Sequence, residues 1–417
     1  MRIIRGRVFY RDRIENLDIG VGEDGRIASI RKVLDGKDVE DHGDLLILPG
    51  GVDLHVHLRE PGLTEKEDFA SGTRSAALGG VTAVADMPNT RPPVTTREAL
   101  RSKAARVRGR AAVDYGLYGA PQSEEAVSDL REAVAFKVYM AETTGGLQID
   151  GETLRGVLAA AAPRRKLVVA HAEDASLFTK DAPATLAGHS RMRPKEAEVE
   201  AIHTLAKVRG DGPLHVAHVT CVEALDAIPE GVTTEVTPHH LFLDSSRPLK
   251  AFGKVNPPLR SPEDRVALWD AFVGGRIDIV ATDHAPHTRE EKEEPFEEAP
   301  SGLPGVATSL PLLLRQVRAG ALSLERFVQA TATRPAEILG VPKGRIEVGR
   351  DADLIVVDAR HVVKVTPRRV RYKCGWTPFE GMEAVFPRTV YLRGERIVED
   401  GEAIAEGLGR PLLPEEP

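Results

Sequence analysis

Eight short apolar segments, separated by stretches long enough for helices, constrain the fold of this 417-residue chain more than any other feature. Most of them are rich in valine and isoleucine, as parallel strands buried on both faces are. Two of the stretches that could hold crossover helices are Glu124–Val134 and Pro194–Arg209, the second with apolar residues near helical spacing. The eight segments are Leu45–Val52, Val81–Asp86, Val113–Tyr118, Ala135–Met140, Leu167–His171, Leu214–Val219, Val232–Val236 and Ile277–Thr282.

Eight β-α units over roughly 250 residues predict an α/β fold of the (β/α)8 TIM-barrel type. A doubly wound open sheet is the alternative; polar residues at the ends of strands throughout the set favour the barrel. Both ends of the chain instead read as short strands with polar turns, which predicts a discontinuous β-sandwich domain built from both termini. The expected division is 1–46 and 340–417 for the sandwich and 47–339 for the barrel. A charge run at Arg289–Glu294 is expected to be a solvated loop.

The composition narrows the class of protein. Hydrophobic residues make up 41% and charged residues 29%, as in ordinary globular proteins. A net charge of -7 does not support a nucleic-acid partner, and no apolar run approaches the ~20 residues of a membrane span. The N-terminal residues lack the apolar core of a signal peptide. The two cysteines, Cys221 and Cys374, are far apart, which excludes a disulfide framework and predicts a cytoplasmic protein.

Histidine and aspartate residues stand at the ends of several predicted strands. His55 and His57 are at positions i and i+2, which point to the same side of an extended strand. His171 and His218 lie at or near the ends of the fifth and sixth segments, and Asp283 follows the eighth. The His-x-His pair alone is weak evidence, but five potential ligands converge on one mouth of the barrel. Neutral imidazole and carboxylate suit Zn²⁺ or a related divalent ion.

Lys137 lies inside an otherwise apolar predicted strand. An inward lysine there would be a buried charge, which is costly unless it is paired. Burial lowers the pKa of an amine, and a neutral amine can take up CO₂ to form a carbamate that bridges two metal ions. An unmodified lysine paired with Asp283 or Glu235 is the alternative. The residues alone leave both interpretations open.

Six motifs follow one another along the chain: Gly51–Gly62, Asp86–Thr90, Pro238–His240, Lys254–Arg260, Thr282–His287 and Trp376–Gly381. Together they resemble the motifs of the dihydroorotases in the amidohydrolase superfamily. The first and the fifth resemble the two signatures of these enzymes, and the resemblance covers nearly the whole chain. Arg59 and Asn89 favour dihydroorotase over other cyclic amidohydrolases, and the long-chain type, also part of the animal multifunctional pyrimidine-synthesis protein, is the most similar.

The resemblance implies a binuclear zinc site bridged by a carboxylated lysine. In the animal relatives a further zinc uses a cysteine directly before the sixth-strand histidine and a glutamate on the seventh strand. Glu235 is present here, but Ala217 replaces the cysteine, so a third metal is not expected. The implied ligands are His55, His57 and Asp283 for one ion and His171 and His218 for the other, with carboxylated Lys137 between them.

Substrate contacts are expected on the same side of the barrel. Dihydroorotate and carbamoyl-aspartate carry carboxylates, which a guanidinium fork such as that of Arg59 binds bidentately. A surface arginine, a turn asparagine and a loop histidine are the plainer interpretations of Arg59, Asn256 and His287. The resemblance adds backbone contacts near Ser301 and Gly302. The expected substrate-binding residues are His57, Arg59, Asn89, Asn256, His287, Ser301 and Gly302.

Other polar residues carry weaker expectations. Thr143 and Thr144 could form a lid over the substrate or belong to a plain flexible loop. His215 stands three residues before His218, so it should face away from it and be structural. The histidines without a motif are expected to be exposed or in a second layer around the site: His42, His189, His203 and His361.

The implied reaction is the reversible cyclisation of N-carbamoyl-L-aspartate to L-dihydroorotate in pyrimidine (UMP) biosynthesis. In the hydrolytic direction, a hydroxide bridging the two metals would attack the ring amide, with Asp283 as general base and then acid. An allantoinase or hydantoinase would share the same ligands. A silent barrel that only scaffolds aspartate transcarbamoylase should have lost ligands, and this chain retains all six. Possible partners are a second copy of the chain and aspartate transcarbamoylase, with no nucleic acid or membrane.

Overall fold

The computed structural model describes residues 1–142 and 146–412, and its centre is a closed barrel of parallel strands. Hydrogen bonds join β5–β7 in one sheet and β8–β12 in another. Bridges between Gly119 and Phe136 and between Val56 and His284 link both edges of these sheets, which confirms the predicted TIM barrel. The strands are β5 (Gly51–Val56), β6 (Val81–Asp86), β7 (Asp114–Leu117), β8 (Phe136–Tyr139), β9 (Val168–His171), β10 (Leu214–Val216), β11 (Thr233–Val236) and β12 (Ile279–Val280).

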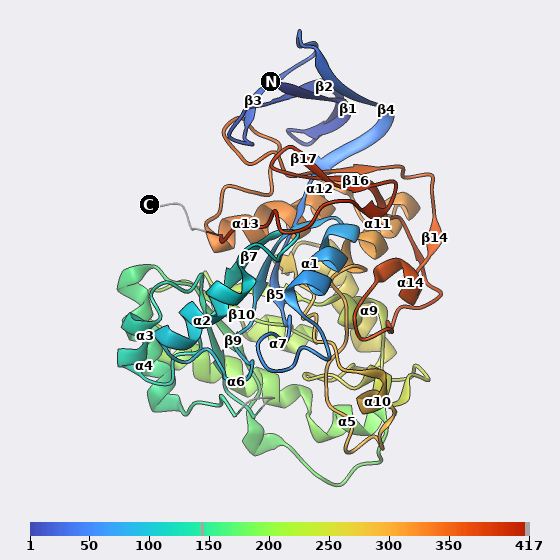
Figure 1. Ribbon diagram of the computed structural model, residues 1–417. Helices are drawn as coiled ribbons and strands as arrows, with labels where there is room; N and C mark the ends of the chain where they lie inside the picture. Colours follow the sequence, from blue (N-terminus) through green and yellow to red (C-terminus); the bar gives the residue numbers. More distant parts are fainter. Residues whose placement is uncertain (143–145, 413–417) are drawn as a thin grey trace.

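Helices surround the barrel (Figure 1). Many begin at a side chain that accepts a hydrogen bond from the first turn, as Asp68 does from the Ser71 amide at 2.9 Å. Within the described part of the chain, no helix has the length and apolar character needed to cross a membrane. The α-helices are α1 (Phe69–Leu78), α2 (Arg97–Val107), α3 (Glu124–Asp129), α4 (Gly151–Ala161), α5 (Leu186–Met192), α6 (Lys195–Val208), α7 (Val222–Ala227), α8 (Pro238–Phe242), α9 (Pro262–Val273), α10 (Arg289–Glu293), α11 (Ser309–Ala319), α12 (Leu324–Val328), α13 (Arg334–Leu339) and α14 (Pro367–Val370).

Both ends of the chain build one further sheet, which lies above the barrel in Figure 1. This confirms the predicted β domain assembled from both termini. Its strands follow the order β18-β17-β16-β13-β4-β1-β2-β3, and side chains from both terminal segments share one apolar cluster. A separate pair is formed by β14 (Val363–Lys364) and β15 (Glu383–Ala384). The eight strands are β1 (Arg2–Tyr10), β2 (Arg13–Val21), β3 (Ile27–Arg31), β4 (Asp38–Pro49), β13 (Leu354–Val357), β16 (Pro387–Leu392), β17 (Glu395–Glu399) and β18 (Glu402–Ala403).

The predicted first strand, Leu45–Val52, divides between the two sheets. Its first part ends β4, and the barrel begins only at β5. The chain changes partners at Gly50, whose amide donates to Asp353 O, and Gly51, whose amide donates to Gly80 O. A Cβ at Gly50 would collide with the Thr82 side chain, so the crossing requires glycine. Residues 47–49 therefore pair within the terminal sheet. The domain boundaries expected at residues 46 and 339 remain a proposal.

Two further expectations are revised by the structure, and one is confirmed. The helix expected over Pro194–Arg209 is present as α6. The helix expected over Glu124–Val134 is shorter, because α3 ends at Asp129 and the chain turns towards β8. The charge run Arg289–Glu294 is not a simple solvated loop but contains helix α10, which a reciprocal capping box between Thr288 and Glu291 starts.

A buried ionic cluster fastens the terminal sheet to the barrel. The ammonium group of Lys343 lies 2.7 Å from Asp114, 2.8 Å from Asp351 and 2.7 Å from Asp353. Asp114 begins barrel strand β7, whereas Asp353 directly precedes β13 of the terminal sheet. Arg393 adds a second ion pair to Asp114. The three carboxylates could hold a metal ion by their spacing, but the lysine ammonium already supplies the cation.

We expect Lys343→Ala to lower the free energy of unfolding by about 3–5 kcal/mol, because it leaves buried carboxylates without their cation. Urea unfolding followed by circular dichroism measures the change. Lys207→Ala is the matched control: Lys207 is 71% exposed with a single distant ion pair, so its loss should cost under about 1 kcal/mol. Equal free energies of unfolding for the two variants would show that the Lys343 cluster does not stabilise the fold.

Candidate active site

The predicted ligands and substrate contacts gather in one pocket at the carboxyl ends of the barrel strands. Apolar residues two positions before the ligands on the same strands, such as Val169 and Ala281, are buried in one apolar cluster. His287, a further predicted site residue, contacts Arg59 and Ser301 of the lining. The pocket is lined by His55, His57, Arg59, Asn89, Lys137, Tyr139, His171, His218, Val255, Asn256, Asp283, Ala285, Ser301 and Gly302.

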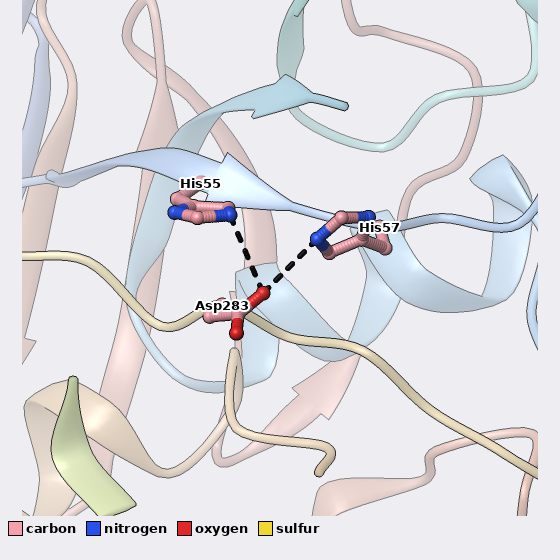
Figure 2. Close-up of side chains that lie close together, drawn as sticks. All are labelled: His55, His57 and Asp283. Carbon is pink, nitrogen blue, oxygen red and sulfur yellow. Dashed lines mark hydrogen bonds and ion pairs between the residues drawn. The ribbon is translucent and has the colours of Figure 1, made fainter. Parts of the chain in front are cut away.

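His55, His57 and Asp283 form the tightest group in the pocket. Asp283 Oδ1 lies 3.0 Å from His57 Nε2 and 3.3 Å from His55 Nε2 (Figure 2). The potential ligand atoms of the three residues all lie within 4.8 Å of one another. Burial lowers the pKa of His57 to about 4, which keeps its imidazole neutral and able to bind a cation. The set of two imidazoles and a carboxylate fits a divalent metal ion.

His171 and His218 form a second group beside the first. The centroids of their rings are 4.6 Å apart, and the His218 ring lies 5.5 Å from that of His55. Burial lowers the pKa of both imidazoles, so both are neutral. The buried Nδ1 of His218 has no hydrogen-bond partner in the described part of the chain, which leaves it available as a ligand.

Lys137 stands in the same pocket on β8, and its side chain is buried. Its amine has no hydrogen-bond partner among the described residues, and no ion pair joins it to Asp283 or Glu235. Burial lowers the pKa of this amine to about 8. The plain ion-paired lysine considered from the sequence is therefore not what the structure contains. A buried amine of this kind is an unsatisfied polar group that calls for a chemical explanation.

Two carboxylates behind the pocket and one amide of its lining orient the imidazoles. Glu235 Oε1 lies 2.5 Å from His55 Nδ1, Glu173 Oε2 lies 2.7 Å from His171 Nε2, and Asn89 Oδ1 lies 2.6 Å from His57 Nδ1. Such partners fix the tautomer and direction of a metal-binding histidine. The other oxygen of Glu235 contacts His215 at 3.1 Å, so His215 has the structural role expected of it.

The backbone is strained at three residues of the pocket. Arg59, His218 and Asp283 all have positive φ angles, of 62°, 39° and 44°. Non-glycine residues seldom adopt this conformation, and such strain concentrates at functional sites. In each case the strained residue lies two or three residues after the end of a barrel strand, and its side chain lines the pocket.

Arg59 and the loop after β12 form the far wall of the pocket. Arg59 is buried, with Nε donating to Pro286 O at 3.0 Å and Nη2 lying 3.2 Å from His287 Nε2. Ser301 Oγ contacts Asn256 Oδ1 at 3.3 Å. The Gly302 amide already donates to Lys254 O at 3.0 Å. The side chain of Ser301 is thus placed towards the pocket, while the Gly302 amide is engaged within the protein.

Sequence reasoning overlooked one residue of this pocket and left the place of a second one open. Tyr139 lines the pocket with a buried hydroxyl that has no hydrogen-bond partner within residues 1–142 and 146–412, and its position two residues after Lys137 on β8 could have identified it. His189 is buried, and its Nε2 lies 2.8 Å from Asn256 Oδ1. It therefore lies in a second layer around the site, which is one of the two positions expected for it from the sequence. The lid expected at Thr143 and Thr144 lies outside the described residues.

Comparisons with known proteins agree with this pocket. The model of the amidohydrolase family matches residues 46–397. A dihydroorotase of Halobacterium salinarum is 42% identical, covering 98% of this chain and 99% of its own, and one of Methanosarcina acetivorans is 38% identical over 97% and 94%. The solved L-hydantoinase of Arthrobacter aurescens has a TM-score of 0.91 at 30% identity, covering 98% of this chain and 99% of its own. The chain therefore belongs to the amidohydrolase family and, within it, to the dihydroorotases.

Proposed function

We propose that this chain catalyses the reversible cyclisation of N-carbamoyl-L-aspartate to L-dihydroorotate in pyrimidine biosynthesis. The observation that carries this proposal is a buried arginine, Arg59, in the same pocket as six potential metal ligands. An arginine that is removed from water binds a carboxylate through charge-assisted hydrogen bonds. Dihydroorotate offers that carboxylate on a cyclic amide, and the relatives named dihydroorotase share the full length of the chain.

Two zinc ions are proposed as the cofactor, with Lys137 carboxylated between them. His55, His57 and Asp283 would hold one ion, and His171 and His218 the other. The unpartnered amine of Lys137 supports this arrangement, because a carbamate would convert it from a buried donor into an anionic ligand. When bound, divalent ions lower the pKa of water and polarise a carbonyl oxygen.

Asp283 is proposed as the residue that moves the proton. In the hydrolytic direction, the water oxygen bonds to the ring carbonyl carbon as Asp283 accepts its proton. Asp283 then delivers this proton to the ring nitrogen while the carbon–nitrogen bond breaks. Burial acts to raise the pKa of Asp283, but His55 and the hydrogen bond from His57 outweigh it and lower the pKa well below its usual range. The carboxylate is therefore ionised and able to accept a proton from bound water.

His57, Arg59, Asn89, Asn256, His287, Ser301 and Gly302 are proposed as the substrate-binding residues. Arg59 and His287 would hold the carboxylate, and the amides of Asn89 and Asn256 would hold the ring or the ureido group. A hydantoinase is the rival, because the solved hydantoinases share the fold. A homodimer, an association with aspartate transcarbamoylase and a cytoplasmic location stay as predictions.

We expect about two zinc ions per chain in active protein, because the ligands form two adjacent groups. Elemental analysis by plasma mass spectrometry on purified protein measures this. Removal of the metal by a chelator should abolish turnover of dihydroorotate, and added Zn²⁺ should restore it. Full activity with only traces of any transition metal would contradict the proposal.

Arg59→Lys should lower kcat/KM for dihydroorotate about ten- to hundredfold, because the charge remains but the bidentate fork is lost. This range corresponds to the roughly 1.5–3 kcal/mol of a hydrogen bond to a charged group. Zinc content should be unchanged, because Arg59 is not a proposed ligand.

Allantoin, which has no carboxylate, is the control substrate for this variant. An allantoinase would turn it over in the wild type and show no dependence on Arg59. Near-normal dihydroorotate kinetics in Arg59→Lys, with zinc intact, would show that the carboxylate is held elsewhere.

A further inference from the structure

The imidazole of His287 is held by neighbours on every polar atom. Lys66 Nζ lies 3.2 Å from Nδ1, and Ser301 O lies 3.1 Å from Nε2. The backbone oxygen of His287 accepts a hydrogen bond from Trp376 Nε1 at 2.8 Å. His287 is 1% exposed, so these contacts are shielded from water. The ring is therefore fixed in both position and orientation.

These contacts select one tautomer of the ring. A lysine ammonium has no acceptor, so the contact with Lys66 is a hydrogen bond only when Nδ1 of His287 accepts. The ring proton is then on Nε2, where Ser301 O accepts it. In the other tautomer, Nδ1–H would point at the ammonium, and the Nε2 lone pair would face Ser301 O. Glu291 Oε2, at 3.5 Å from Nδ1, would favour the second tautomer, but only the first makes the shorter contacts with Lys66 and Ser301 favourable.

The Nε2–H tautomer matters because of Arg59. Arg59 Nη2 lies 3.2 Å from His287 Nε2, and both groups are then donors. Two neighbouring donors cannot satisfy each other, so they are arranged for a shared acceptor. Burial, with the nearby Arg59 charge, lowers the pKa of His287 to about 3, so the ring is a neutral donor beside a charged one. A ligand carboxylate has the two oxygens that this arrangement requires.

We propose that Lys66 is a positioning residue for substrate-carboxylate binding, which acts by holding His287 as an Nε2–H donor beside Arg59. Lys66 lies in the β5–α1 loop, whereas His287 lies in the loop after β12, so Lys66 ties together the two loops that would hold the carboxylate. This inference rests on the proposed function, because it assigns a ligand to Arg59 and His287.

Glu291 holds Lys66 in this position. Its Oε1 lies 2.6 Å from Lys66 Nζ, and its Oε2 accepts from the Thr288 amide at 3.0 Å. The Lys66 side chain is 11% exposed, so this ion pair is largely buried. The carboxylate lies in α10 within the charge run, and the capping box that starts this helix also aims Glu291 at Lys66. The Lys66 side chain has a fixed direction because its ammonium group donates to the Glu291 carboxylate on one side and to His287 Nδ1 on the other.

The test compares Lys66→Met with Lys66→Arg by steady-state kinetics of dihydroorotate hydrolysis. Lys66→Met keeps an unbranched side chain but removes the donor, so KM should rise about tenfold, the value of one lost hydrogen bond, with kcat changed less than threefold. Lys66→Arg retains a donor and should recover most of the affinity. Lys373→Met is the control, because Lys373 pairs with Asp68 at the end of the same loop without contacting His287.

Nitrogen-15 NMR of histidine-labelled protein reads the tautomer directly and needs no turnover. The wild type should show the His287 ring, assigned by its loss in His287→Asn, as the Nε2–H form, and Lys66→Met should shift it towards a mixture. An Nδ1–H ring in the wild type, or an unchanged KM in a folded Lys66→Met protein, would overturn the role of Lys66. Failure of the wild type to hydrolyse dihydroorotate would instead overturn the proposed function. The tautomer of His287 in the wild type and in Lys66→Met would still show whether Lys66 holds the ring as the Nε2–H form.

Discussion

A lysine amine buried at the mouth of the barrel, without a hydrogen bond to any residue that the structure describes, is the constraint on which the rest of the site depends. Lys137 is 1% exposed, and among the described residues its amine has no hydrogen-bond partner and only the face of the Tyr139 ring, at 5.6 Å, to compensate for the lost hydration. The pocket around it is instead rich in neutral imidazole and carboxylate, which are groups that bind cations. This arrangement is unfavourable for an apoprotein and becomes favourable once the amine is converted to an anionic ligand and cations bind beside it.

The barrel supplies the geometry for such a site because the two parts of a strand have different roles. Apolar residues on the earlier part of the strands pack the interior, and polar residues at the carboxyl ends turn into the pocket. Arg59, His218 and Asp283 take left-handed backbone conformations at these ends, a strain that a well-packed scaffold can sustain. The surrounding glutamates and Asn89 then hold the imidazoles in one tautomer.

Much of this could be predicted from sequence because it follows local rules. Strand periodicity places His55 and His57 on one side, and the strand ends place His171, His218 and Asp283 at the same mouth. The boundary between β4 and β5 could not be predicted, because Leu45–Val52 is continuously apolar and only the partners of Gly50 and Gly51 divide it.

Contacts between residues distant in sequence were also beyond prediction. His189 reaches Asn256, and Lys66 reaches His287, across separations of 67 and 221 residues. No spacing rule connects such pairs, because the fold alone brings their loops together. The charge run at Arg289–Glu294 was predicted wrongly for a different reason. Its many charged residues indicated a solvated loop, but the Thr-x-x-Glu pattern of Thr288 and Glu291 is typical of a helix start.

The most direct test of this account is carbon-13 NMR of the zinc-loaded protein prepared with labelled bicarbonate. The account predicts a carbamate carbonyl resonance in the wild type that is absent from Lys137→Ala, together with loss of bound zinc in that variant. A wild-type protein that holds two zinc ions and hydrolyses dihydroorotate without this resonance would contradict the central role given to Lys137.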